Sequence, residues 1–242
     1  DNSIRAAIEL GCRTMQRVFN ADDSGIPFFG SSVWPDASLS FSAHHSEAHI
    51  PGRHLNALLT AQDALGIDVD EASIDAHTKA AFFSYSGPVA LPLNRAELDG
   101  PLRNFLTHNI REGFHALYAL VRYRQSETAR QIAEASIDAI LDHWDPEIGW
   151  DQRLADQHKL IVDDSTFAVG LGRALGPLVK YYRTTGYGSA LQLATLLKEK
   201  ALTECFPPDG SYNRQVLGNH THSTTCLMSS LAQYADLTRD SI

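Results

Sequence analysis

The sequence predicts an all-α fold made of one domain over residues 1–242, and three observations support that prediction. Apolar residues recur at helical spacing in eight segments, while the alternation typical of half-buried strands is scarce. The segments also repeat in pairs. If His54, His115, Arg173 and Cys226 are taken as equivalent points, the intervals are 61, 58 and 53 residues, which is the period of a repeated helical hairpin.

The helices are expected in a regular order, joined by loops rich in glycine and proline. Their predicted ranges are 3–19, 44–66, 70–84, 107–124, 126–144, 163–186, 188–204 and 221–237. Asp70 and Ser126 are residue types that cap helix N-termini. Pro51 lies inside the second range and forces either a kink or a later start. Pro177 predicts a bend in the middle of the sixth.

Polar residues gather at the starts of the even-numbered helices and not at the starts of the odd-numbered ones. The four groups are His44, His45, Glu47 and His49; His108, Asn109, Arg111 and Glu112; Asp163 and Asp164; and Asn219, His220 and His222. If the even-numbered helices form an inner ring and the others an outer ring, all four groups meet at one end of one cavity. A concave site with a few convergent polar groups is the usual form of a ligand site.

Composition narrows the class of partner. The formal net charge is −9 with a pI near 5.6, and no run of basic residues is present, so we expect neither a nucleic-acid nor a membrane partner. No apolar stretch approaches the roughly 20 residues of a membrane span, and the first residues have no signal-peptide pattern. Three cysteines without framework or metal-motif spacing favour a reducing, cytoplasmic location.

Two segments resemble parts of known sugar-degrading enzymes. VDDSTFAVGLGRALGPLVKYYRTTG, residues 162–186, resembles the acidic-pair segment of unsaturated glucuronyl and rhamnogalacturonyl hydrolases. NHTHSTT, residues 219–225, is similar to the Asn-His segment of toroid-fold uronate lyases. The whole chain resembles the (α/α) toroid superfamily, which includes the six-hairpin glycoside hydrolases. The resemblance implies a toroid of helical hairpins, here an incomplete or open ring of about four. Such a ring would expose apolar surface, which predicts a homo-oligomer or a missing C-terminal segment.

A glycoside hydrolase acting on oligosaccharides, including those that contain uronic acid, is the function these features favour. Hydrolysis requires a carboxylic acid that protonates the leaving oxygen and, in most families, a second carboxylate. Asp163 and Asp164 are the predicted acid/base residues, with Glu112 or Glu47 as the partner. The alternative for the aspartates is a capping role at a helix N-terminus.

Two other functions remain open at this level. A uronate lyase needs a base and a group that neutralises the carboxylate. His108, Asn109, Arg111, His220 and His222 supply those types, with Tyr212 or Tyr85 as proton donor. A helical-repeat protein that binds glycans without chemistry is the third hypothesis.

The remaining predicted site residues contact substrate. They are His115, His45, His49, Trp34 and Trp150, the tryptophans being suited to stacking on sugar faces. His45 and His49 share a helical face at i, i+4, but they do not form the HExxH order of zinc proteases. Glu47 and His44 lie close by, so a zinc or other divalent ion is the alternative. We expect hydrogen-bonding histidines, with no metal and no cofactor. Cys226 is expected to be a small core residue.

Overall fold

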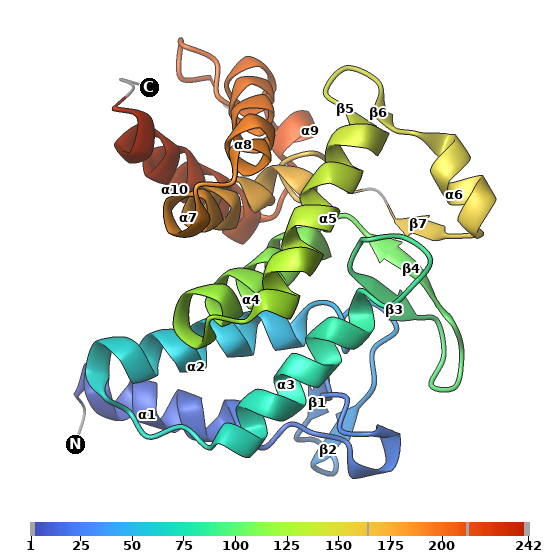
Figure 1. Cartoon of the computed structure of the whole chain (residues 1–242), viewed down its shortest axis with the longest axis vertical. Helices are drawn as coiled ribbons and strands as arrows, with labels where there is room; N and C mark the ends of the chain where they lie inside the picture. Colours follow the sequence, from blue (N-terminus) through green and yellow to red (C-terminus); the bar gives the residue numbers. More distant parts are fainter. Residues whose placement is uncertain (1–2, 164, 212, 240–242) are drawn as a thin grey trace.

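The computed structural model describes residues 3–163, 165–211 and 213–239, and it is mostly helical (Figure 1). The helices are α1 (Ile4–Met15), α2 (Ile50–Leu65), α3 (Glu71–Ser84), α4 (Asn109–Arg124), α5 (Glu127–His143), α6 (Gln152–His158), α7 (Leu175–Thr185), α8 (Gly188–Lys200), α9 (Arg214–Leu217) and α10 (Thr221–Thr238). None of these described helices has both the length and the apolar character needed to cross a lipid bilayer.

Four helices form an inner row. α2 packs on α4, α4 on α7 and α7 on α10, while α3, α5 and α8 each pack against the inner helix that precedes them in the chain. α1 adds to the outside of α2, and Figure 1 shows the hairpins stacked from the N-terminal to the C-terminal half. The predicted alternation of inner and outer helices matches this packing. Among the described elements the main packing contacts run from α2 to α10 and do not include α10 on α2, so a closed toroid is not confirmed.

The α2–α4 contact is the closest in the row. Leu55 and Leu58 of α2 and Ile110 of α4 are completely buried at it. A Cβ atom at Gly52 would lie 1.8 Å from the backbone oxygen of Glu112, so only glycine lets the two helices approach this closely.

Small sheets supplement the helices. They are β1 (Gly30–Ser32) with β2 (Ser38–Ser40), β3 (Leu93–Arg95) with β4 (Leu102–Leu106) and β7 (Ile161–Asp163), and β5 (Trp144–Asp145) with β6 (Gly149–Trp150). β7 pairs in parallel with β4, placing Asp163 opposite Leu106. The backbone N–H of Thr107 donates to the oxygen of Asp163 at 3.3 Å. Because β4 leads directly into α4, this pairing brings Asp163 to the start of α4.

The second helix takes the later of the two starts that Pro51 allowed: it begins at Ile50, and Pro51 occupies its first turn. Two predicted features of the sixth helix are wrong. The sixth begins at Leu175, after a 3-10 turn at Leu171–Ala174, so Asp163 is a strand residue and not a helix cap. Pro177 lies in the first turn of α7, where an N–H has no intrahelical partner to lose, and not in mid-helix. Strands of two to five residues are too short for their alternation to be recognised.

We expect Gly52→Ala to lower the free energy of unfolding by about 1–3 kcal/mol, the usual cost of overpacking a core contact. The added methyl group meets backbone atoms of α4, which cannot rotate away. Urea denaturation followed by circular dichroism measures the change. Gly188→Ala is the matched control, since its Cβ would meet nothing within 4 Å and its effect should stay within about 0.5 kcal/mol. Equal effects of the two substitutions would contradict this account of the α2–α4 contact.

Candidate functional site

A carboxylate surrounded by arginines lies where three inner elements meet. The side chain of Glu112 in α4 is completely buried. Its Oε1 accepts hydrogen bonds from Arg111 Nη1 at 2.6 Å and Arg173 Nη2 at 2.9 Å. Arg53 Nε of α2 lies 3.6 Å from the same oxygen. One negative charge therefore faces three positive charges, and we call this group the arginine centre.

The ionisation of Glu112 follows from these contacts. Burial alone would raise its pKa, but the positive charges, that of Arg111 foremost, lower the pKa overall. The carboxylate stays ionised at neutral pH, which argues against the predicted use of Glu112 as a proton donor. Its contacts instead balance charge and hold α2, α4 and the turn before α7 together. The other predicted partner, Glu47, is committed to a buried ion pair with Arg95, whose Nε lies 2.5 Å from its Oε1.

A cavity of about 280 Å³ adjoins the arginine centre, between the four inner helices. Its lining residues are Asn56, Arg111, His115, Gly176, Pro177, Lys180, Thr225, Cys226, Ser229, Ser230 and Gln233. The predicted site residues Arg111 and His115 thus lie in one cavity, whereas Lys180 and Gln233 were not predicted. None of these lining residues is acidic, so Arg111 and Lys180 give the cavity a basic wall.

Four buried polar atoms without a partner in the described part of the chain belong to this cavity or to the arginine centre beside it. Glu112 Oε2, Arg173 Nε, His115 Nδ1 and Asn56 Oδ1 are buried and have no hydrogen-bond partner among the described residues. A buried polar atom without a partner is costly, so a group of them indicates a place that binds a polar ligand or water.

Burial controls the protonation of the cavity's bases. It lowers the pKa of His115 to about 3, with Arg111 adding to the effect, so the imidazole is neutral at pH 7. Burial and Arg111 also lower the pKa of the Lys180 ammonium. The proton of Lys180 is therefore released more easily than that of an exposed lysine.

The predicted residues of α10 divide between two roles. His220 caps the helix, because its Nδ1 accepts from the backbone N–H of Ser223 at 3.1 Å. His222 lies within the field of the arginine centre: burial and then Arg173 lower its pKa, and its Nε2 is 3.5 Å from Cys226 Sγ. Cys226 is half-buried and lines the cavity, so its prediction as a core residue is wrong.

A second group, the histidine cluster of His45, His49 and His108, lies at the start of α2 and α4. One ring nitrogen from each histidine lies within 4.8 Å of one from each of the others. His45 Nε2 and His108 Nε2 are 3.2 Å apart. The ring of Phe29 stacks on His45 with centroids 4.1 Å apart. His45 and His49 come just before α2, and His108 comes just before α4. Predicted site residues from two distant segments of the chain therefore converge.

All three histidines are neutral at pH 7. Burial is the first cause, and it lowers the pKa of His45 to about 4, that of His49 to about 2 and that of His108 to about 4. Arg53 lowers the values of His45 and His49 further. Each ring therefore offers a lone pair, the form in which imidazole binds metals or accepts hydrogen bonds.

The predicted site residues Asp163, Trp34 and Trp150 neither line the cavity nor belong to the histidine cluster. Asp163 is exposed at the end of β7, close enough to His108 for its charge to oppose slightly the lowering of that histidine's pKa by burial. Asp164 lies outside the described residues, as does Tyr212. Trp34 is 83% exposed in the β1–β2 loop. Trp150 is partly buried and packs edge-on against the buried Phe105, with centroids 4.9 Å apart.

Sequence reasoning missed several members of the site, although the repeat held a usable signal. Three of the four equivalent points of the repeat, His115, Arg173 and Cys226, lie at or beside the cavity. Lys180 could have been noticed as a cation within the apolar segment of α7. Arg53 gives no such signal, since its role depends on a helix far away in sequence.

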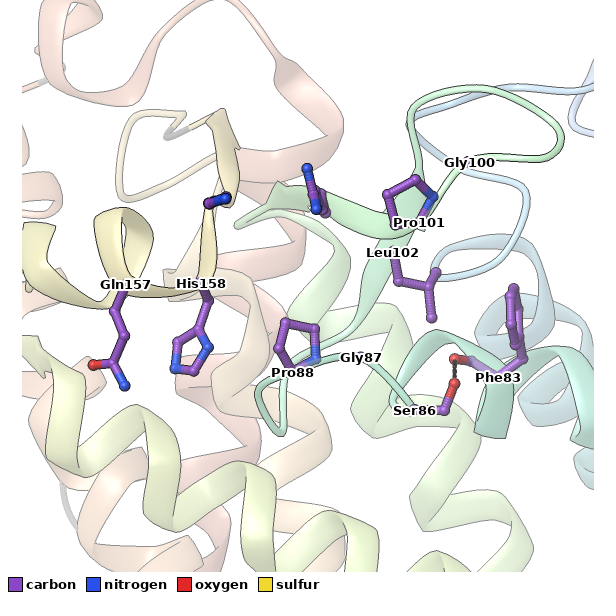
Figure 2. Close-up of a pocket in the computed structure, with 11 residues that line it drawn as sticks. Phe83, Ser86, Gly87, Pro88, Gly100, Pro101, Leu102, Gln157 and His158 are labelled. Carbon is purple, nitrogen blue, oxygen red and sulfur yellow. Dashed lines mark hydrogen bonds between the residues drawn. The ribbon is translucent and has the colours of Figure 1, made fainter.

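A separate surface hollow of about 710 Å³ lies between the end of α3, the β3–β4 connection and α6. Figure 2 shows Gln157 and His158 on one side of it and Phe83 and Ser86 on the other, with Pro88 between them. No predicted site residue lines this hollow, and the buried unpaired polar atoms of the arginine centre do not border it. The cavity of the inner helices is the stronger candidate site.

No family model, curated protein or solved structure matches the chain. Function must therefore be argued from the residues of the site.

We expect Glu112→Gln to cost about 3–5 kcal/mol of unfolding free energy at pH 7, because three guanidinium groups lose their buried counter-charge. Urea denaturation measures it. Glu71→Gln removes a carboxylate that is 63% exposed and pairs with Arg124, so this control should change stability by less than about 1 kcal/mol.

The effect of Glu112→Gln on the free energy of unfolding should depend on pH. The pKa of Glu112 in the folded state is below its ordinary value of 4.5, so its stabilisation is complete above pH 4.5 and is lost as the pH falls through the folded value. The stability difference between wild type and Glu112→Gln should narrow in acid. A difference that widens as the pH falls would contradict the assignment.

Proposed function

We propose that the protein is a carbohydrate-active enzyme that binds the carboxylate of a uronic-acid-containing oligosaccharide in the cavity between α2, α4, α7 and α10. The observation that carries the proposal is the basic wall of this cavity, with Arg111 and Lys180, beside buried polar atoms that have no protein partner. A carboxylate on a small polar ligand would satisfy both features at once.

The cavity's size and polarity support a sugar acid as the ligand. A guanidinium binds a carboxylate through charge-assisted hydrogen bonds, and Arg111 is the cation that lines the cavity beside Glu112. Asn56, Ser229 and Gln233 offer donors and acceptors for hydroxyl groups. At about 280 Å³ the cavity is at the small end of the roughly 300–1,000 Å³ range for ligand pockets, which suits one sugar residue held at a time.

β-Elimination is the reaction that the described residues support best. The base removes the proton from the carbon beside the carboxylate, the electron pair forms a carbon–carbon double bond, and the glycosidic oxygen leaves and takes up a proton. Lys180 is the proposed base, because its lowered pKa brings it closer to the working pH. Arg111 would stabilise the enolate-like anion, and neutral His115 would donate or accept a hydrogen bond.

Hydrolysis is a second candidate, and the position of Asp163 favours it. The β4–β7 pairing holds this exposed carboxyl beside His108 at the start of α4. Protonation of the leaving oxygen by a carboxylic acid is the step that hydrolysis requires.

We expect the wild-type protein to cleave uronic oligosaccharides, and Lys180→Met to reduce the rate by about 10²–10⁴-fold, the usual contribution of a general base. Mass spectrometry and the ultraviolet absorbance of an unsaturated product follow the reaction. Lys79→Met is the matched control, because Lys79 is exposed on α3 and should have no effect.

The products separate the hypotheses. An unsaturated product supports elimination. A gain of water that is lost in Asp163→Asn supports hydrolysis in its place. Saturable binding without turnover would identify a glycan-binding protein. If neither uronic nor neutral oligosaccharides bind or react, the proposal is wrong.

A further inference from the structure

We propose that His45, His49 and His108 form a binding site for one divalent transition-metal ion, best fitted by zinc, with its fourth coordination position open. This site is separate from the basic cavity, and the inference does not depend on the proposed sugar chemistry.

The first support is the spacing of the ring nitrogens. Zinc binds imidazole nitrogen at about 2.0–2.1 Å in tetrahedral geometry, which places two ligand nitrogens about 3.3–3.4 Å apart. The Nε2 atoms of His45 and His108 are 3.2 Å apart. His49 brings a third nitrogen within 4.8 Å of one from each. Three imidazoles and an open position are the ligand set of catalytic zinc sites.

The second support is the hydrogen bonding behind the rings. Asn109 is completely buried, and its Nδ2 donates to the backbone oxygen of His44 at 2.8 Å. Its Oδ1 must therefore accept from His49 Nδ1, 3.0 Å away, which leaves the Nε2 lone pair of His49 free. Behind the ring of His45, Ser42 Oγ lies within hydrogen-bond distance of Nδ1, at 3.1 Å. Metal-binding histidines usually have such a partner on the second ring nitrogen, because it fixes the tautomer and the ring orientation.

The third support is where the histidines stand in the helices. His49 and His108 occupy the N-cap positions of α2 and α4, yet neither side chain caps its helix. Ser, Thr, Asp and Asn normally fill this position because they bond the free N–H groups of the first turn. The two side chains turn toward each other and toward His45 instead, which helix stability alone does not explain.

The charges around the cluster define the fourth ligand. The N-terminal ends of α2 and α4 carry partial positive charge, and Arg53 is near enough to affect His45 and His49. A dication there requires an anion as its fourth partner, such as hydroxide or a carboxylate. Asp163, beside His108, is the described carboxyl available to meet the ion or its bound water. Burial keeps all three imidazoles neutral, as metal binding requires.

The test is titration of the metal-free 242-residue chain with Co²⁺, followed by displacement with Zn²⁺. Tetrahedral Co²⁺ gives intense visible absorption bands, so binding is observed directly. We expect one ion per chain. His49→Ala should weaken binding by more than about 100-fold, and Asn109→Ala by about 10–100-fold, through loss of the partner behind the ring. Circular dichroism of each metal-free variant confirms that it remains folded.

His44→Ala is the matched control. His44 is exposed, immediately precedes His45 and lies outside the group of converging nitrogens, so its loss should leave metal affinity unchanged. Folded wild-type protein that binds no Co²⁺ at millimolar concentration would overturn the proposal. So would binding that survives in His49→Ala, or that is lost in His222→Ala, which would place the ion at the histidines of α10.

Discussion

The contact between α2 and α4 at Gly52 is the constraint on which both polar groups depend. With no side chain at this position, the backbone of α2 rests directly on that of α4 at Glu112. His49 precedes Gly52 by three residues and Arg53 follows it, so the closest point of the contact lies between the two clusters. A wider separation would move His49 away from His108 and Arg53 away from Glu112 at the same time. One backbone approach therefore fixes both sets of distances.

The histidine cluster and the arginine centre lie next to each other along α4, and the charge of their side chains differs. His108 and Glu112 are four residues apart on α4, which is about 6 Å along the helix axis, so they lie on one face in successive turns. At the helix starts the imidazoles are neutral, because burial and nearby positive charge oppose protonation. One turn further in, Glu112 is ionised among arginines. Neutral imidazoles and guanidinium cations thus lie side by side, an arrangement suited to binding a polar, anionic ligand.

The sequence was sufficient for the parts of the structure that local periodicity decides. The helical class, the pairing of inner and outer helices, and the gathering of His45, His49 and His108 follow from spacing along the chain. Arg111 lies apart from these histidines, in the lining of the cavity between the inner helices. Asp163 was misplaced because its position depends on parallel pairing with β4, a contact between distant segments that leaves no pattern in a three-residue strand.

The role of Glu112 could not be predicted for a related reason. A glutamate near the start of a helix is an ordinary feature, and only its partners distinguish a proton donor from a charge-balancing group. Arg173 is 61 residues away in sequence and contacts Glu112 only because α7 packs on α4. The pKa of a buried carboxyl depends on the neighbours that the whole fold supplies, so residue type and spacing identify the place and not the protonation state.

Arg53 links the two clusters energetically. It lies 3.6 Å from Glu112 Oε1, and its charge also lowers the pKa of His45 and His49. An ion held by the histidines would be repelled by the same charge that Glu112 attracts, so its affinity would depend on how well Glu112 compensates Arg53. An anion bound in the adjoining cavity would reduce that repulsion. By thermodynamic linkage, the ion would then strengthen anion binding by the same factor as the anion strengthens ion binding. The ion pair between the exposed Arg53 and the buried Glu112 would couple the occupancy of the two sites even without any movement of the helices.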